Sequence, residues 1–309
     1  MKFILLSDVH LTADKPVARF DSDMLRVGIN KLEYVFQYAH DNDISEVLQG
    51  GDFVDTKRSW ETLSVLSKFL EKWQCNGISL SCCLGQHDSF FHDMSNEKTT
   101  MGILISTGLV RRLNSSRHVA NDRDVSIYGS SFGEGIPVVK NKRDFNILVC
   151  HRQILMAKEW ARQEDYDYAP AFLKEHEDFD LILCGDAHQK FDFKLNKRII
   201  CNTGPLMRLE ATDEMMNHQP CFYVFDTETR KLSTHLIPAK SGSEVLSKDH
   251  ISIQKLRKQN FDDFIDKVQE IDGQNQSLDF SQNLQAIIKQ SKASDNVKYK
   301  ISEYLAKGE

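Results

Sequence analysis

The residues in this sequence that could carry out chemistry stand at the ends of apolar runs. The first run, 3–6, is followed by Asp8 and His10, which are separated by one residue. In an extended chain, residues i and i+2 point the same way, so this carboxylate and imidazole can bind one metal ion. Four later runs also end in Asp, His or both, at Gly51-Asp52, Gly85-Gln86-His87-Asp88, Cys150-His151 and Gly185-Asp186-Ala187-His188. One Asp-x-His pair is common by chance, but the repetition favours a metal site.

Such a set of side chains suits the hydrolysis of a phosphate ester. That reaction needs charge neutralisation at phosphorus, a nucleophile stronger than water, and help for the departing oxygen. Two cations roughly 3.5–4 Å apart supply the first two needs. A pair of cations requires about seven protein ligands, and the sequence offers Asp8, His10, Asp52, Gln86, His151, Asp186 and His188. His87 is then left over to assist the leaving group.

The segments between these runs predict the elements that position them. Apolar residues recur at helical spacing over 25–39 and again over 63–73, each between two strand-like runs. Alternation of strand and helix indicates parallel strands with crossover helices, and ligands gather at the carboxyl ends of such strands. Further patterns predict helices over 101–109, 152–163 and 169–176, and strands over 125–128, 145–150, 198–201, 221–225 and 232–237.

A change of composition near Ser241-Gly242-Ser243 indicates a linker. We therefore expect one domain over 1–240 and a small helical region over 241–309. Three apolar stripes in that region either pack together as a satellite unit or dock a partner helix.

The overall composition is that of a globular protein. Hydrophobic residues make up 40% of the chain and charged residues 27%. No apolar segment approaches the roughly 20 residues of a membrane helix, so no membrane association is expected. Six of the seven cysteines lie in apolar runs without zinc-type spacing, which predicts reduced core thiols and a cytoplasmic location. The net charge of -6 argues against wholesale coating of nucleic acid but allows local basic patches.

Taken in order, the motifs resemble the five signatures of calcineurin-like metallophosphoesterases. Within that superfamily, Gly51-Asp52-Phe53-Val54-Asp55-Thr56 is similar to the Gly-Asp-x-Phe-Asp-Thr of SbcD-type DNA repair nucleases. Asn202-Thr203-Gly204-Pro205-Leu206 stands where those enzymes carry a Gly-Ser-Pro turn. The resemblance covers residues 1 to about 240. It implies an α/β sandwich of two central mixed β-sheets flanked by helices, with the C-terminal region as a small helical extension.

The resemblance also implies roles for individual residues. Asp8, His10, Asp52 and His188 would hold the first metal, with Asp52 bridging, and Gln86, His151 and Asp186 would complete the second. His87 would protonate or stabilise the leaving oxygen, oriented by Asp55, whose charge favours a protonated imidazole. The implied cofactors are two divalent metal ions, with manganese as the expected ion and magnesium as the alternative.

Two positions depart from the family pattern. The family has Asn where Gln86 stands, and usually His where Asp186 stands. The extra methylene of Gln86 displaces the amide oxygen by about a bond length, and catalysis tolerates little misplacement. Asp186 makes the second site harder and more anionic, which favours manganese or magnesium over zinc or copper. We expect both metals to bind, the second more weakly.

The leading functional hypothesis is a metal-dependent nuclease that cleaves DNA phosphodiester bonds at duplex ends. The resemblance implies an SbcC-type coiled-coil ATPase as partner. The chain contains no Gly-Lys-Thr/Ser phosphate loop, so any ATP dependence would have to come from another protein. The resemblance also implies a homodimer, although no apolar stripe in the sequence identifies the dimer interface. Two alternatives stay open: a phosphodiesterase acting on a small nucleotide, and a catalytically degenerate DNA-binding or scaffold subunit. Arg111, Arg112 and His92 are candidates for substrate contact, with a solvated face as the alternative for the arginines.

Overall fold

The computed structural model describes residues 1–89, 98–116, 118–119, 125–139, 142, 144–157, 166–249 and 298–299. One compact unit runs from Met1 to Ser247, and a second comprises Lys248–Glu309. The expected boundary at 240 therefore falls seven residues before the end of the first unit. Most of the expected helical region, 250–297 and 300–309, lies outside the described residues.

The first sheet carries four parallel strands at its centre and one edge. Its order is β14-β13-β1-β2-β3-β4. Strands β1 to β4 are parallel, whereas β13 runs antiparallel to both β1 and β14. The strands are β1 (Lys2–Leu6), β2 (Glu46–Gln49), β3 (Ser79–Cys82), β4 (Val110–Arg112), β13 (Cys221–Asp226) and β14 (Lys231–Leu236).

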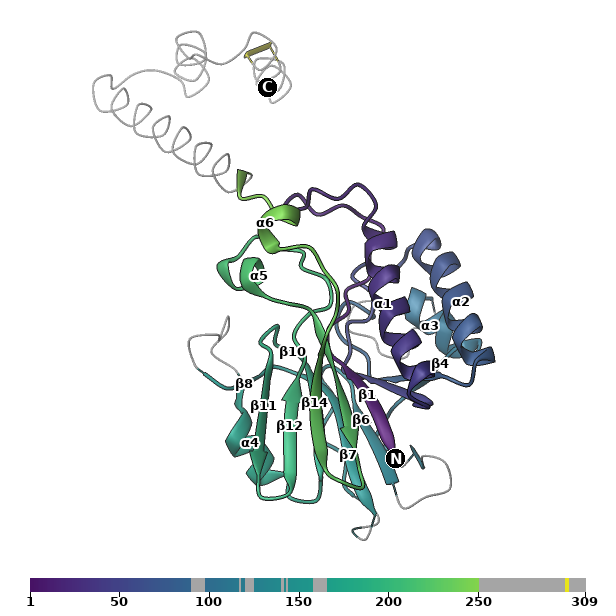
Figure 1. Ribbon diagram of the computed structural model, residues 1–309, viewed down its shortest axis with the longest axis vertical. Coiled ribbons are helices and arrows are strands. Elements are labelled where there is room, and N and C mark those ends of the chain that lie inside the picture. Colours follow the sequence, from purple (N-terminus) through teal and green to yellow (C-terminus); the bar gives the residue numbers. More distant parts are fainter. Residues whose placement is uncertain are drawn as a thin grey trace, which may run out of the picture. The chain divides into compact units, whose positions relative to one another are not determined.

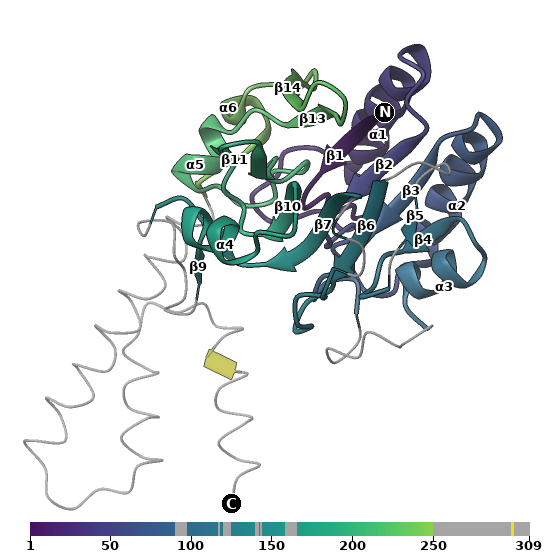
Figure 2. The same ribbon diagram turned by 90° about the horizontal axis from the view of Figure 1, so that it is seen from below.

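The second sheet has the order β11-β12-β10-β7-β6-β5. Its four inner strands are parallel, and antiparallel β11 and β5 close its two edges. Figure 2 shows β10, β7 and β6 in one row and β1, β2 and β3 in another. The strands are β5 (His118–Val119), β6 (Val125–Ser130), β7 (Phe145–Arg152), β10 (Leu181–Asp186), β11 (Phe191–Leu195) and β12 (Arg198–Asn202).

Helices flank the two sheets on their outer faces. Figure 1 shows α1 (Met24–Asp41), α2 (Trp60–Cys75) and α3 (Thr100–Ser106) together on one side of the strands, with α4 (Ala169–Glu175) on the other. The remaining helices are the short α5 (Asp213–Asn217) and α6 (Gly242–Val245). Among the described residues, no helix combines the length and the apolar character needed to cross a membrane.

Strand β1 shows how the sequence builds the two layers. Phe3 and Leu5 face the second sheet and pack in the core between the sheets. Ile4 and Leu6 alternate with them and pack in the core beneath α1 and α2. Because side chains alternate along a strand, a continuous apolar run fills both layers and leaves no solvent face. The first polar residues after it therefore stand where the strand leaves the sheet.

Most of the expected elements are present, but the helix expected over 152–163 is wrong at its start. There β7 continues to Arg152, because its last residues remain paired with Gly185 and Asp186 of β10. The next residues form β8 (Ile154–Leu155), which pairs with β9 (Asp167–Tyr168). Residues 158–165 of that expected helix lie outside the described residues. The seven cysteines are free, and all except Cys75 are buried, as expected.

Candidate metal centre

The candidate ligands gather at the carboxyl ends of parallel strands from both sheets. Asp8 follows β1, Asp52 follows β2 and Gln86 follows β3. His151 is the second-to-last residue of β7, and Asp186 is the last residue of β10. The backbone carbonyl of Asp52 accepts hydrogen bonds from the N–H groups of Val9 and His10, both at 3.0 Å. These bonds fix the loop after β1 against the loop after β2.

Three of these residues have left-handed backbone conformations. The φ angles are 49° at His10, 52° at Asp52 and 79° at Asp186. Non-glycine residues rarely adopt this region, which costs roughly 1–3 kcal/mol each unless the surroundings enforce it. The turns aim side chains from separate strand ends into one space, so the strain accompanies the convergence of the ligands.

The first group of ligand atoms comprises Asp8, His10 and His188, which all lie within 4.8 Å of one another. The Nε2 atoms of His10 and His188 are 3.0 Å apart. Asp8 is fully buried; one oxygen accepts from the backbone N–H of Asp186 at 2.8 Å, and Oδ2 has no hydrogen-bond partner. A buried carboxylate with one unpartnered oxygen, grouped with two imidazoles, fits a divalent cation.

Burial and charge show why a cation is needed at Asp8. Burial raises the pKa of Asp8 to about 6, despite the opposing effect of His151 and His10. A carboxyl group with so high a pKa lacks sufficient positive charge nearby. The donor set therefore fits a metal ion.

The second group centres on His151, whose Nε2 faces three oxygen atoms. It lies 2.8 Å from Gln86 Oε1, 3.3 Å from Asp52 Oδ2 and 3.8 Å from Asp186 Oδ1. The opposite ring nitrogen, Nδ1, donates to the Gly50 carbonyl at 2.8 Å. That bond fixes the tautomer in which Nε2 is the metal-binding nitrogen.

The carboxylates around His151 favour the protonated, positively charged form of its ring. Burial opposes the charged imidazole, but the carboxylates of Asp52, Asp8 and Asp186 raise the pKa of His151 to about 10. The same interaction with His151 outweighs burial and holds the pKa of Asp52 well below its usual range. Metal binding here must displace that proton.

Asp52 lies between the groups, as a bridging ligand would. Its Oδ2 faces His151, and it belongs with Asp8 and His151 to a set of ligand atoms within 4.8 Å. Its Oδ1 accepts from the backbone N–H of His87 at 2.8 Å. The buried carboxylate therefore also positions the loop that carries His87.

His87 and His10 share the carboxylate of Asp55. Asp55 Oδ1 lies 3.3 Å from His10 Nδ1 and 3.5 Å from His87 Nδ1. His87 Nδ1 also lies 3.1 Å from the Asp55 carbonyl oxygen, which can only accept. The His87 side chain is 42% exposed, whereas that of His10 is 4% exposed. His87 is therefore the more accessible of the two imidazoles, and its Nε2 is the ring nitrogen that Asp55 does not contact.

Two glycines in the motifs are required by the close packing of the loops. A Cβ at Gly51, where φ is +93°, would lie 2.3 Å from His151 Nδ1. A Cβ at Gly85 would lie 2.0 Å from Asp52 Oδ1. Any larger residue at either position would displace a candidate ligand.

Asp88 is a positioning residue that the sequence analysis did not single out. Its carboxylate accepts from the backbone N–H of Val54 at 3.1 Å and from that of Gly85 at 3.0 Å. These bonds join the loops after β2 and β3. The available signal was its place in the Gly85-Gln86-His87-Asp88 motif, but neither its burial nor its partners can be read from the sequence.

The turn at 202–206, which the sequence analysis matched to a family turn, lies against the loop after β1. Thr203 and Ser7 exchange two hydrogen bonds, from Ser7 N to Thr203 Oγ1 at 2.8 Å and from Thr203 N to Ser7 Oγ at 3.0 Å. Leu206 N donates to the Asp8 carbonyl at 2.8 Å. The turn therefore supports the backbone on which Asp8 stands.

Two of the three candidate substrate contacts, Arg111 and Arg112, form ion pairs with glutamates that are not among the candidate ligands. Arg111 pairs with the buried Glu46 at 3.2 Å, and Arg112 pairs with Glu134 at 3.2 Å. Both ion pairs serve to join β4 to its surroundings. His92 lies outside the described residues.

Two helix-flanked sheets whose joint carboxyl edge collects buried His and Asp side chains are characteristic of metal-dependent hydrolases. The family model of calcineurin-like phosphoesterases matches residues 1–190. The chain belongs to that family, whose members use divalent metals to hydrolyse phosphoesters.

Solved structures similar to this chain include the protein TT1561 of Thermus thermophilus, with 12% identity and a TM-score of 0.48, covering 77% of this chain and 99% of that one. An archaeal phosphodiesterase shares 11% identity with a TM-score of 0.41, over 77% of this chain and 100% of its own. A dimetal phosphatase from Danio rerio shares 10% identity with a TM-score of 0.46, over 72% of this chain and 91% of its own. No curated protein matches the chain significantly.

Proposed function

We propose that this protein is a metal-dependent DNA nuclease of the SbcD type. The observation that carries the proposal is the convergence of seven candidate ligands from two sheets beside His87, whose side chain is 42% exposed to solvent. The specific choice of DNA rests on the motif similarity at 51–56 and on the surface next to it.

The residues divide into two ligand sets around Asp52. Asp8, His10 and His188 would hold one ion together with Asp52, and Gln86, His151 and Asp186 would hold the other. Ions held there would supply charge neutralisation at the phosphate and a nucleophilic oxygen from water at neutral pH. The amide and carboxylate oxygens of the second set favour manganese, with magnesium as the alternative.

His87 would act on the leaving oxygen. Its Nδ1 is held by Asp55, through the carbonyl at 3.1 Å and the carboxylate at 3.5 Å. The Nε2 nitrogen is therefore the one directed to substrate, and a protonated imidazole can donate its proton as the ester bond breaks.

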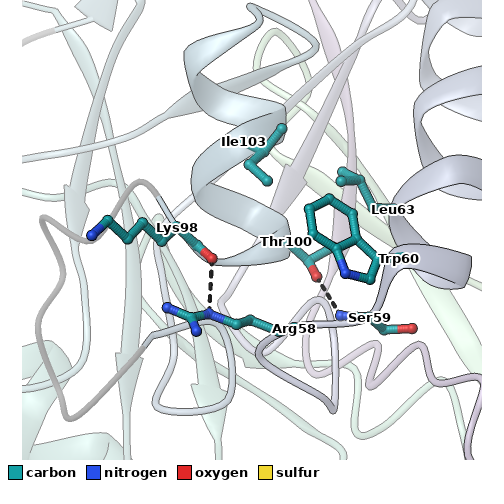
Figure 3. A pocket seen from close by; sticks show the side chains of 7 residues that line it. All are labelled: Arg58, Ser59, Trp60, Leu63, Lys98, Thr100 and Ile103. Carbon is teal, nitrogen blue, oxygen red and sulfur yellow. Dashed lines mark hydrogen bonds between the residues drawn. The ribbon is translucent and has the colours of Figure 1, made fainter.

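An apolar pocket beside the Asp55 loop supports a nucleic-acid substrate. Its volume is about 400 Å³, and it is lined by the indole of Trp60, Leu63 and Ile103 with Arg58 and Lys98 (Figure 3). Trp60 is 82% exposed, as a platform for base stacking would be. Arg58 follows Asp55 by three residues, which span at most about 11 Å, so the pocket lies within a few nucleotides of the proposed centre.

The pocket is held in place by the start of α3. Thr100 N donates to the Lys57 carbonyl at 2.8 Å, and Ser59 N donates to Thr100 Oγ1 at 3.2 Å. Arg58 Nε donates to the Lys98 carbonyl at 3.1 Å (Figure 3). A stacking residue on a supported loop loses little entropy on binding.

The proposed partners follow from the same resemblance. An SbcC-type ATPase would supply the ATP dependence, with the region 241–309 as its proposed docking segment, and a homodimer is the proposed assembly. Gel filtration with light scattering tests the homodimer.

Two other functions would give different results in one experiment. The acidic net charge of -6 favours a small-nucleotide phosphodiesterase, and the direct Gln86 to Asp186 contact favours a degenerate scaffold. Purified full-length protein with manganese should be assayed on end-labelled duplex DNA, single-stranded DNA and a cyclic nucleotide, with bound metal counted in parallel.

Two bound ions and DNA cleavage that is lost in His87→Ala are the expected results. Cleavage of the cyclic nucleotide alone would favour the small-substrate phosphodiesterase. Intact substrates with one ion or none would overturn both enzyme hypotheses.

A further inference from the structure

A second cavity lies against one face of α1, and none of the described residues that line it is a candidate metal ligand. Its volume is about 340 Å³. Helix α1 contributes residues at helical spacing, and the segments after β12 and β14 supply the other walls. The charged and aromatic side chains in the lining are Arg19, Asp21, Lys31, Tyr34, Arg208 and Lys240.

The lining carries an excess of positive charge. Arg19, Lys31, Arg208 and Lys240 line it, and Asp21 is the only carboxylate among the described lining residues. Four cations and one anion leave a formal charge of +3 (4 − 1). This concentration contrasts with the net charge of -6 for the chain.

Three of the cations are more than nine-tenths buried. The exposed fractions are 4% for Arg19, 7% for Lys31 and 2% for Arg208. Buried charges are almost always paired, because removing an ion from water costs several kcal/mol. Here Arg19 pairs with Asp21, and no carboxylate within the described residues forms an ion pair with Lys31 or Arg208.

Apart from a contact of Lys31 Nζ with Met207 Sδ at 3.8 Å, the remaining hydrogen bonds of these cations go to backbone carbonyls. Lys31 Nζ donates to the Leu206 carbonyl at 2.6 Å, and Arg19 Nη1 donates to the Arg208 carbonyl at 2.9 Å. Arg208 donates to the carbonyls of His218, at 3.3 Å, and Lys240. A guanidinium carries five N–H donors, and the buried Nε atoms of both Arg19 and Arg208 have no partner. The cluster therefore has unused donors as well as uncompensated charge.

Burial and the positive charges of the cluster lower the pKa of one of its own members, Lys31. Burial, reinforced by Arg208 and Arg19, lowers the pKa of Lys31 to about 7. An anion in the cavity would remove that repulsion, because it would offset the charges that disfavour the ammonium group.

We propose that this cavity is a binding site for a phosphomonoester of mononucleotide size. Arg19, Lys31 and Arg208 would hold the phosphate, which guanidinium groups bind with matched geometry. The volume exceeds that needed for a bare phosphate and lies at the lower end of small-molecule sites. Tyr34, which is 43% exposed on α1, offers an aromatic face to the organic part. The proposal is independent of the nuclease activity.

The ligand could come as a free mononucleotide or as the terminal phosphate of a strand. Calorimetric titration of the full chain should use adenosine 5′-monophosphate, inorganic phosphate, adenosine and a 5′-phosphorylated trinucleotide. A chelator in the buffer removes metal-dependent binding at the other centre. We expect adenosine 5′-monophosphate to bind at one site, and adenosine at least about tenfold more weakly. If the trinucleotide competes with adenosine 5′-monophosphate, the natural ligand is the phosphate at a strand end. If it does not compete, the natural ligand is the free nucleotide.

Matched variants separate this site from nonspecific attraction. Lys31→Met should weaken adenosine 5′-monophosphate binding at least about tenfold, whereas Lys68→Met, which removes one exposed charge from α2, should leave it unchanged. Lys240→Gln changes an exposed lining residue, so it keeps the test decisive if Lys31→Met fails to fold, and it should weaken binding severalfold. Equal effects of Lys240→Gln and Lys68→Met, or no saturable binding to the unaltered chain, would overturn the proposal.

Discussion

Gln86 donates a hydrogen bond from Nε2 to Oδ1 of Asp186 over 2.9 Å, so the two residues that depart from the family pattern contact each other directly. Gln is one methylene longer than the family Asn, and Asp is shorter than the family His. The side chain of Gln86 therefore extends into the space that Asp186 leaves open by being shorter than a histidine. Because Gln86 Oε1 also lies 2.8 Å from His151 Nε2, the altered pair remains attached to the second ligand group.

This contact predicts that the two positions are coupled. Gln86→Asn should withdraw the amide from Asp186, and Asp186→His should crowd the longer Gln86. We expect each single variant to lose about 10- to 100-fold in kcat/KM on a phosphodiester, since small misplacements at a reacting centre have effects of that order. The double variant should recover most of the loss. Losses that simply multiply in the double variant would show that the positions act independently.

His87→Ala should lower kcat by about 10²- to 10⁴-fold, the range for loss of a general acid. Bound metal, counted by mass spectrometry, should stay unchanged, because His87 is outside the proposed ligand sets. A p-nitrophenyl diester needs less protonation of its leaving group, so its hydrolysis should fall much less than that of DNA. Equal losses on both substrates would contradict the acid role.

Asp88→Ala should destabilise the fold. It leaves the backbone N–H groups of Gly85 and Val54 without their acceptor, and a buried donor without a partner costs about 1–3 kcal/mol. Asp88→Asn retains one acceptor oxygen and should cost less. Urea unfolding measures both values, and Asp192→Asn, at an exposed carboxylate, serves as the control with an expected change near zero.

Trp60→Ala should weaken binding of single-stranded DNA by about 1–3 kcal/mol, the range for one stacked base. Fluorescence anisotropy in a chelator measures affinity without cleavage. Tyr168→Ala removes another exposed aromatic side chain and should have no effect. Hydrolysis of a small diester should be unaffected by either change, and a loss of that activity in Trp60→Ala would indicate a disturbed centre.

The pKa of Lys31 predicts a pH dependence of stability. Its pKa is lowered from 10.5 to about 7 by burial and by Arg208 and Arg19, so between these values the unfolded chain holds a proton that the folded chain lacks. The free energy of unfolding should therefore rise with pH over this window, by up to about 1.4 kcal/mol per unit. Below pH 7 both states are charged, and the full cost of burying the ammonium applies.

The measurement is the difference between the unaltered chain and Lys31→Met in urea unfolding at several pH values. Subtracting the variant removes the contribution of the cysteines and tyrosines, which titrate in the same range. Parallel stability profiles would contradict the prediction. A phosphate ester that occupies the cavity should flatten the difference, because it restores the charged lysine.

The sequence was sufficient to place the candidate ligands in one region. Apolar runs such as 3–6 are long enough for a strand buried on both faces, and helical spacing between them required parallel order. Parallel order brings the carboxyl ends of one sheet to one edge, so Asp8 and Asp52, which follow the neighbouring strands β1 and β2, had to lie near each other. His151 stands on β7 of the second sheet and joins them only through the packing of the two sheets. Local turn chemistry could not be predicted in the same way after β7, where pairing with β10 overrode the helical pattern from residue 152.

Contacts between distant segments were decided only by the tertiary structure. Gln86 and Asp186 are 100 residues apart, and their departures from the family pattern look like separate defects until the two sheets bring them together. Lys31 is a second example. From the sequence, a lysine outside the apolar stripe of a helix is predicted to be exposed to solvent, yet Lys31 is buried. Periodicity records which face of an element is apolar, whereas burial of a polar group depends on the neighbouring segments, here the turn that ends at Leu206.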